Sequence, residues 1–379
     1  MDYAKRSAHM RQEMAARGID VLFLPSCGDR QYLTGIATER PCTTHHHRSG
    51  DWLDGLFFTQ KEAILACPWM KRAWAREEGE KNPLVTDVII LDEGRDYVAY
   101  AADILTRLGL RAPVIGVPKA AMAKSLVNLK RACSGASFVN IESITCPMRM
   151  VKDPEEIAIM REASRIADEA FLAVLPQIHA GMLELEVAQA LEKEMFLRGA
   201  ECVSFPTDVM ALKKGAPCDG GSGLVKLEKG CNIAFDFGCV YQGYCSDTGR
   251  TIFLGEPSRK CLDIHKLVMA SQQAAIDALA PGAITCVELD GVARKVINDG
   301  GYYDEFFHRL GHNIGVDVHE YPYLNKGYTQ PILENMTLTV EPSIMIPGEL
   351  RIRVEDVVLV TAQGGEPLNK VTKEPIILE

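Results

Sequence analysis

Two aspartates lie in a largely apolar stretch, residues 233–253, and this stretch constrains the fold more than any other part of the chain. Its pattern predicts two antiparallel strands joined by a loop at residues 240–243, with Asp236 in the first strand and Asp247 in the second. Apolar neighbours surround Asp236, and a buried carboxylate is costly unless another charge pairs with it. Because facing carboxylates repel unless a proton or a cation lies between them, we expect a metal ion here.

Size and charge exclude several classes of protein. The chain has 379 residues, more than one hydrophobic core usually serves, so we expect two domains. Its net charge of -10 argues against a nucleic-acid partner, because phosphates need a basic surface. No apolar run is long enough to span a bilayer, and the polar N-terminus is unlike a secretory signal. The 12 cysteines include no Cys-x-x-Cys pair, which indicates free thiols and a cytoplasmic location.

The pattern of helices and strands places a domain boundary near residue 148. Residues 1–148 alternate short strands with helices, which predicts an α/β layer around a buried sheet. Asp153, Pro154 and Glu156 then form a helix start with a capping box. Residues 149–379 contain further helices over 184–198, 258–279 and 286–299, with strands at 202–205, 338–341 and 351–360. Helix pairs separated by antiparallel strands predict an α+β domain with helices on one face of a curved sheet.

Further acidic and imidazole residues follow downstream. Glu341 and Glu355 each lie in an apolar strand, and His312 lies between two other histidines. Taken singly, a buried glutamate more often pairs with an arginine or a backbone group than with a metal. Together with Asp236 and Asp247, these residues supply four carboxylates and one imidazole, a set that suits two divalent ions such as Mn²⁺, Co²⁺, Fe²⁺ or Zn²⁺.

These motifs resemble those of the pita-bread metallopeptidases, in the branch of prolidase (Xaa-Pro dipeptidase) and aminopeptidase P. The resemblance rests on four ordered motifs: Asp236-x₁₀-Asp247, Gly311-His312 with His319-Glu320-x-Pro322, Val340-Glu341-Pro342 and Arg353-x-Glu355-Asp356. It runs through the whole C-terminal half and extends more weakly to the N-terminal part, at Asp29-Arg-Gln-Tyr32-Leu-Thr-Gly35 and Arg149-x₂-Lys152. It implies a pita-bread catalytic domain over 149–379, a creatinase-like α/β domain over 1–148, and a homodimer.

The resemblance also implies how the metal ligands share two ions. Asp236 would hold one ion, and His312 and Glu341 would hold the other. Asp247 and Glu355 would bridge both ions. A hydroxide bridging the two metals would then attack the Xaa-Pro amide bond of a dipeptide or short peptide.

The remaining site residues would act on the substrate. By resemblance, Glu341 would transfer a proton from the attacking water, and His319 would stabilise the oxyanion. His308 resembles a substrate-binding histidine. Arg353 is grouped with the substrate-binding residues. It would pair with a carboxylate of the metal centre and hold that carboxylate's orientation.

Two positions depart from the family pattern. The family carries another active-site histidine shortly before the first metal aspartate, and Asp219 occupies that place here. An aspartate accepts hydrogen bonds but donates none unless it is protonated, so Asp219 is either a substrate-binding residue for a cationic group or a turn residue. Gly249 replaces a hydroxyl residue, which removes a polar contact near the metals.

These departures leave three functions open. The first is a dinuclear metal-dependent Xaa-Pro peptidase, and the second is a diverged pita-bread enzyme, a creatinase-like amidinohydrolase or a lyase, acting on a non-peptide small molecule. The third is a homodimer that binds metal without catalysis. The segment His45-His46-His47, with Cys42 nearby, is a metal tract, an exposed loop, or a cover for the neighbouring subunit's active site.

Overall fold

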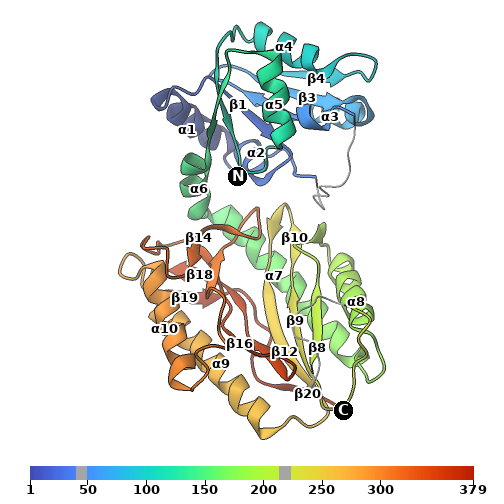
Figure 1. The fold of residues 1–379 in the computed structure, drawn as a ribbon, viewed down its shortest axis with the longest axis vertical. Helices are drawn as coiled ribbons and strands as arrows, with labels where there is room; N and C mark the ends of the chain where they lie inside the picture. Colours follow the sequence, from blue (N-terminus) through green and yellow to red (C-terminus); the bar gives the residue numbers. More distant parts are fainter. Residues whose placement is uncertain (40–48, 213–222) are drawn as a thin grey trace. The chain divides into compact units, whose positions relative to one another are not determined.

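The structure, a computed structural model, describes residues 1–39, 49–212 and 223–379 (Figure 1). These residues form two compact units, Met1–Arg149 and Met150–Glu379. Each unit is packed around clusters of buried apolar residues of its own. Within the described ranges, no helix is both long and apolar enough to cross a membrane.

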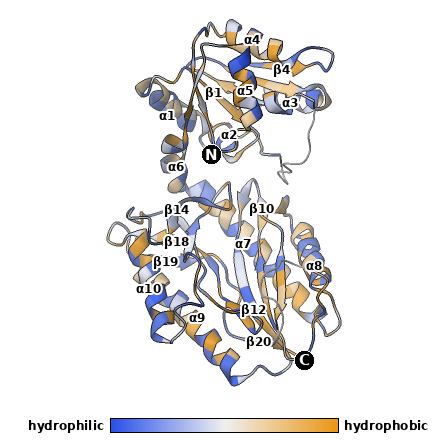
Figure 2. Cartoon of the chain, in the orientation of Figure 1, coloured by the Kyte–Doolittle hydropathy of each residue, from blue (hydrophilic) through white to orange (hydrophobic). Residues whose placement is uncertain are grey.

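A six-stranded sheet forms the centre of the first unit, in the order β4-β3-β2-β1-β5-β6. Its strands are β1 (Val21–Pro25), β2 (Gly55–Phe58), β3 (Ala63–Pro68), β4 (Asp87–Leu91), β5 (Val114–Val117) and β6 (Ser137–Asn140). β2 and β3 form the hairpin expected from the sequence, closed by a hydrogen bond from the Thr59 amide to the Glu62 carbonyl. Figure 2 shows β1 coloured as hydrophobic, which agrees with its complete burial.

Helices surround this sheet and confirm the expected α/β architecture. They are α1 (Tyr3–Ala16), α2 (Gly28–Thr34), α3 (Arg72–Lys81), α4 (Tyr97–Arg107), α5 (Ala123–Ala132) and α6 (Glu142–Met150). The core joins apolar residues of the sheet to α4 and α5 through Ile104, Leu105 and Leu129. The sequence did not predict α6, which contains Pro147, because a proline usually marks a helix end.

The second unit packs two pairs of helices against two sheets (Figure 1). α7 (Pro154–Val174) and α8 (Glu184–Leu197) share a core with the sheet β20-β12-β9-β8. α9 (Arg259–Ala278) and α10 (Cys286–Asp299) share the other core with the sheet β14-β13-β15-β18-β19. The predicted capping box at the start of α7 is present: Asp153 accepts from the Glu156 amide, and Glu156 accepts from the Asp153 amide.

The strands of this unit confirm the α+β class. They are β7 (Cys202–Val203), β8 (Asp208–Leu212), β9 (Asn232–Phe237), β10 (Cys239–Tyr241), β11 (Tyr244–Cys245), β12 (Thr248–Leu254), β13 (Gly311–Asn313), β14 (Glu320–Leu324), β15 (Thr337–Val340), β16 (Ser343–Ile346), β17 (Leu350–Arg353), β18 (Asp356–Thr361), β19 (Gly364–Pro367) and β20 (Ile376–Leu378). β16 pairs with β17, and β10 pairs with both β7 and β11.

The two sheets meet where Gly249 and Glu355 exchange backbone hydrogen bonds. The Glu355 amide donates to the Gly249 carbonyl at 2.9 Å, and the Gly249 amide donates to the Glu355 carbonyl at 3.3 Å. The single strand expected over residues 351–360 was therefore wrong. The chain leaves β17 at Arg353, pairs once with β12 at Glu355, and enters the next sheet as β18 at Asp356. This change of sheet directs Glu355 into the space between the two sheets.

Candidate metal centre

Asp236 and Asp247 come from the two neighbouring strand segments that the sequence singled out. β9 and β12 are antiparallel, and Asp236 lies opposite Gly249 rather than opposite Asp247. Asp247 directly precedes β12 and is 4 % exposed. The two carboxylates still converge, because each offers an oxygen within 4.8 Å of the other and of an oxygen of Glu355.

Glu341 and His312 approach from the second sheet. Glu341 follows β15 and His312 lies in β13, and both side chains are buried. His312 Nε2 is 3.6 Å from an Asp247 oxygen and 3.5 Å from Glu341 Oε1. Its other ring nitrogen, Nδ1, is 3.1 Å from the Asn313 carbonyl oxygen. If Nδ1 donates that hydrogen bond, Nε2 carries the lone pair that faces the carboxylates.

A cavity of about 470 Å³ joins these residues to the predicted substrate groups. Its lining includes His308, His319 and Arg353 together with all five candidate ligands. The His319 ring packs edge to face against His312, with centroids 4.4 Å apart. Asp219 and the segment His45-His46-His47 lie outside the described residues.

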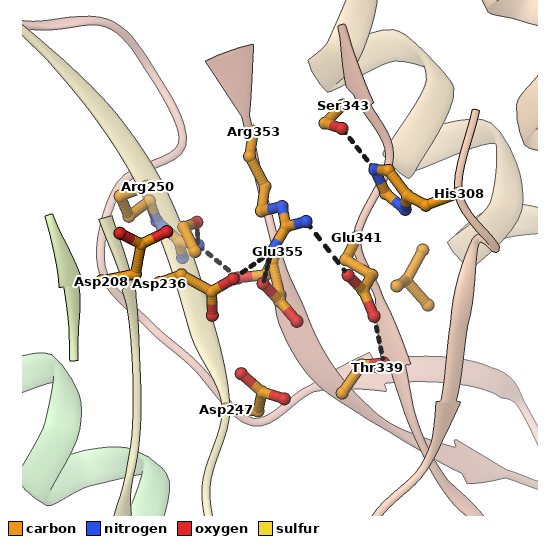
Figure 3. A network of polar contacts seen from close by, with 12 residues as sticks. Asp208, Asp236, Asp247, Arg250, His308, Thr339, Glu341, Ser343, Arg353 and Glu355 are labelled. Carbon is orange, nitrogen blue, oxygen red and sulfur yellow. Dashed lines mark hydrogen bonds and ion pairs between the residues drawn. The ribbon is translucent and has the colours of Figure 1, made fainter. Parts of the chain in front are cut away.

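Arg353 lies among the carboxylates (Figure 3). Its guanidinium donates to Asp236 Oδ2 and lies 3.6 Å from a carboxylate oxygen of Glu341 and from one of Glu355. The predicted pairing between Arg353 and a carboxylate is therefore present in the geometry. Arg351 also lies 3.6 Å from Asp236, but it pairs with Asp208 as well, so the two guanidiniums do not balance these carboxylates and the cluster keeps an excess of negative charge.

Burial makes that excess charge costly. Burial, together with the charges of Asp236 and Glu341, raises the pKa of Asp247 well above its ordinary range. Burial, together with Asp247 and Glu341, has the same effect on the pKa of Glu355. Burial also raises the pKa of Glu341 to about 7, although Arg353 opposes the rise. The cluster is therefore stable only if it binds protons or cations.

The donor set fits divalent cations. Asp247 Oδ1 and Glu355 Oε2 are buried and have no hydrogen-bond partner within the described ranges. Burial lowers the pKa of His312 well below its ordinary value, so the imidazole is neutral, which is the form that binds metals. Carboxylate oxygens with one imidazole suit Mn²⁺, Fe²⁺, Co²⁺ and Zn²⁺.

Gly249 contributes space rather than a side chain. A Cβ atom at this position would lie 2.7 Å from Glu355 Oε2 and 2.9 Å from the Glu355 Cβ. Such contacts are shorter than van der Waals distances, so the Glu355 side chain occupies the volume that a residue 249 side chain would need.

The sequence reasoning missed several residues around the cluster. Asp208 in β8 lies opposite Asp236 and pairs with Arg351 at 2.6 Å, and Arg351 also reaches within 3.6 Å of Asp236. Ser343 contacts His308 Nε2, and Arg309 lines the cavity. The alternation of Arg351 and Arg353 along one strand was the available signal, because residues two apart share a face.

Two family models match the chain. Residues 158–362 match the metallopeptidase family M24, and residues 6–151 match the creatinase/prolidase N-terminal domain. The chain belongs to metallopeptidase family M24. The C-terminal pita-bread fold and the creatinase-type N-terminal domain expected from the motifs are thereby confirmed.

Relatives of this M24 chain include named dipeptidases. A putative dipeptidase of Bacillus subtilis is 34% identical over 349 residues, which cover 92% of each chain. The Xaa-Pro dipeptidase of Pyrococcus furiosus is 37% identical over 248 residues, covering 65% of this chain and 71% of the relative. The crystal structure of a prolidase from Thermococcus sibiricus covers 100% of both chains with a TM-score of 0.90 and 26% identity. An Xaa-Pro dipeptidase from Bacillus anthracis covers 100% of both with a TM-score of 0.86 and 28% identity.

Proposed function

We propose that this M24 chain is a dinuclear metal-dependent hydrolase that cleaves the Xaa-Pro bond of dipeptides or short peptides. The observation that carries the proposal is the convergence of three buried carboxylates, the half-buried Asp236 and one neutral imidazole on a single cavity. The names of the relatives support the choice of an Xaa-Pro substrate.

The proposed ligands are Asp236, Asp247, His312, Glu341 and Glu355. Two bound divalent ions would supply an activated water and would polarise the scissile carbonyl. The protein would hold its ligands in place through surrounding contacts: Arg353 holds one oxygen of Asp236, and the Thr339 hydroxyl lies 3.2 Å from Glu341 Oε1. Asp247 Oδ1 and Glu355 Oε2, which have no hydrogen-bond partner among the described residues, are available for metal binding.

We assign the proton transfers and the substrate contacts to three side chains. Glu341 would accept a proton from the attacking water and deliver it to the leaving nitrogen. His319 is exposed in the cavity beside His312 and would donate to the carbonyl oxygen as negative charge develops on it. His308 would contact the substrate from a ring that Ser343 and the Arg309 carbonyl orient through its two nitrogens.

Metal analysis combined with peptide hydrolysis tests this function. The full chain, stripped with EDTA and reloaded with Mn²⁺ or Co²⁺, should bind two ions and hydrolyse Ala-Pro. Asp247→Asn should lose the second ion and most of the activity, because it removes one proposed bridging carboxylate. Asp277→Asn, the same substitution at an exposed position on α9, is the matched control and should change neither.

Other outcomes favour the other two functions. Two bound ions without hydrolysis of any Xaa-Pro dipeptide or longer peptide contradict the proposal. Cleavage of small amides or guanidino compounds would then indicate a creatinase-like enzyme acting on a small molecule. Ligand binding without any product would indicate a non-catalytic role. The proposal includes a homodimer, which light scattering after gel filtration measures directly.

A further inference from the structure

The segment that carries His308 joins α10 to β13 through turns and irregular backbone over residues 300–310. The backbone groups of such a segment need hydrogen-bond partners from other parts of the chain. Arg294 on α10 supplies two of these partners. Its Nη1 donates to the Phe306 carbonyl at 2.6 Å, and its Nη2 donates to the His308 carbonyl at 2.9 Å. One guanidinium therefore holds the backbone of His308 and of the residue two positions earlier.

Asp290 fixes Arg294 and adds a third contact to the same segment. It lies one helical turn before Arg294 on α10, and it accepts from Arg294 Nε at 3.0 Å and from Nη2 at 2.9 Å. Its Oδ1 also accepts from the Leu310 amide at 3.1 Å. Asp290 is 1 % exposed, so these charge-assisted hydrogen bonds are shielded from water. The pair thus contacts the backbone at three alternate positions, residues 306, 308 and 310.

The rings of this segment pack in line with the same pair. The guanidinium carbon of Arg294 lies 4.2 Å from the centre of the Phe306 ring, a cation–π geometry. The buried Phe306 ring packs edge to face against the His308 ring, with centroids 5.1 Å apart. His308 lines the cavity and faces Ser343 (Figure 3), whereas Asp290 and Arg294 lie outside the described lining. The pair therefore reaches the cavity only through His308.

The strand that follows has further support of its own. The Leu310 amide also donates to the Leu324 carbonyl at 3.0 Å, and β13 pairs with both β14 and β15. His312 on β13 keeps these contacts when Arg294 is changed. A substitution of Arg294 should therefore displace His308 and leave His312 in place.

We propose that Asp290 and Arg294 are positioning residues that hold His308 in the cavity, so that substrate affinity depends on an ion pair the substrate does not touch. This inference rests on the proposed function, which gives His308 a substrate contact. Because His308 is assigned no proton transfer, a displaced ring weakens substrate binding more than it slows the chemistry. Loss of the pair should therefore raise KM and change kcat little.

Arg294→Lys in the metal-loaded full chain tests this inference. The lysine keeps a positive charge beside Asp290, but its single ammonium lacks the planar fork that donates to two carbonyls at once. KM for Ala-Pro should rise by about 3- to 10-fold, the range expected for one modest contact, while kcat and the metal content stay unchanged. The matched control is Arg165→Lys, which changes an arginine on α7 that pairs with Glu162 and Glu169 and should leave KM unaltered.

A double-mutant cycle separates positioning of His308 from a general structural role. If Arg294 acts through His308, Arg294→Lys should raise KM in the otherwise wild-type chain and cause no further rise in the His308→Ala background. A rise of equal size in both backgrounds overturns the inference. A wild-type KM in Arg294→Lys also overturns it.

An NMR measurement decides the inference even if no peptide is cleaved. In EDTA-treated protein with isotope-labelled histidine, the His308 ring signal is identified by its loss in His308→Ala. That signal should shift in Arg294→Lys and stay in place in Arg165→Lys. A shifted signal in a protein without Xaa-Pro hydrolysis contradicts the proposed function but supports the positioning of His308. An unshifted signal overturns the inference, whether or not Ala-Pro is hydrolysed.

Discussion

Replacing Glu355 by glutamine should stabilise the metal-free protein and destabilise the metal-loaded protein relative to wild type. Glu355 is 1 % exposed and shares the cluster with Asp236 and Asp247. Its Oε2 has no hydrogen-bond partner within the described ranges. The glutamine keeps the shape of the side chain, removes its charge and adds donors that the neighbouring carboxylates can accept.

The distances set the size of the effect. The three carboxylates offer oxygens within 4.8 Å of one another; at an effective dielectric constant of about 20, charges at that limit repel by about 3.5 kcal/mol, so Asp236 and Asp247 together oppose an ionised Glu355 by at least about 7 kcal/mol. Arg353, at 3.6 Å, attracts Glu355 by about 5 kcal/mol on the same basis. The difference is at least about 2 kcal/mol of net repulsion, to which the charge of Glu341 adds. Because burial raises the pKa of Glu355, part of this repulsion is already relieved by protonation. We therefore expect a gain of about 1 to 2 kcal/mol in the free energy of unfolding.

Calorimetric unfolding of the full chain measures both states. In EDTA, the transition of the C-terminal unit should rise by roughly 2 to 8 °C in Glu355→Gln, since 1 kcal/mol shifts Tm by about 2 to 4 °C at this size. With Mn²⁺ at 100 times its Kd, wild type should gain about 2.7 kcal/mol per site, and the variant should lose much of that gain. The order of the two Tm values should therefore reverse when metal is added.

A matched control and two contrary results make this prediction sharp. Glu366→Gln removes a carboxylate that pairs with Arg161 at the surface, and it should show no reversal. A Glu355→Gln variant less stable than wild type in EDTA would mean that Arg353 already compensates the cluster. An unchanged stabilisation by Mn²⁺ would mean that Glu355 is not a ligand.

Three further predictions follow from other contacts. Burial raises the pKa of Glu341 from its ordinary 4.5 to about 7. Between pH 4.5 and 7 the folded metal-free protein therefore binds more protons than the unfolded chain, and its stability falls as the pH rises. In urea unfolding with EDTA, the stability of Glu341→Gln relative to wild type should therefore grow from about pH 4.5 to 7; a constant difference would argue against this titration. In the wild type, Arg250 Nη2 lies 2.7 Å from the buried Asp356, which also pairs with Lys373. Arg250→Met removes the first of these partners and should lower the free energy of unfolding by about 3 kcal/mol. An unchanged urea midpoint would contradict this. Asp153→Ala should cost about 1 kcal/mol by removing the cap of α7, with the metal content of the purified protein unchanged.

Local chemistry explains which features the sequence alone could predict. The start of α7 follows from Asp153, Pro154 and Glu156, because a cap is made by residues adjacent along the chain. The β2–β3 hairpin follows in the same way from two short apolar runs around a polar turn. The candidate ligands stood out because carboxylates inside apolar strands conflict with their surroundings.

Contacts between distant segments explain what the sequence could not predict. The break between β17 and β18 depends on a hydrogen-bonded partner, Gly249, that lies about a hundred residues earlier in the chain. The helix α6 forms although it contains Pro147, so its surroundings outweigh the local signal. That Arg309 Nε is buried without a hydrogen-bond partner among the described residues became visible only when its neighbours were placed.

The sequence by itself determined the division into two domains, the fold class of each domain, the M24 motifs, and which charged residues lie within apolar strands. The tertiary structure decided which of those charges meet, that Arg353 lies among them, and that Asp236 lies opposite Gly249 instead of Asp247. The reason is physical. Burial and strand periodicity depend on residues that are neighbours in the sequence, whereas the distance between two charges depends on strand register and on how separate sheets pack.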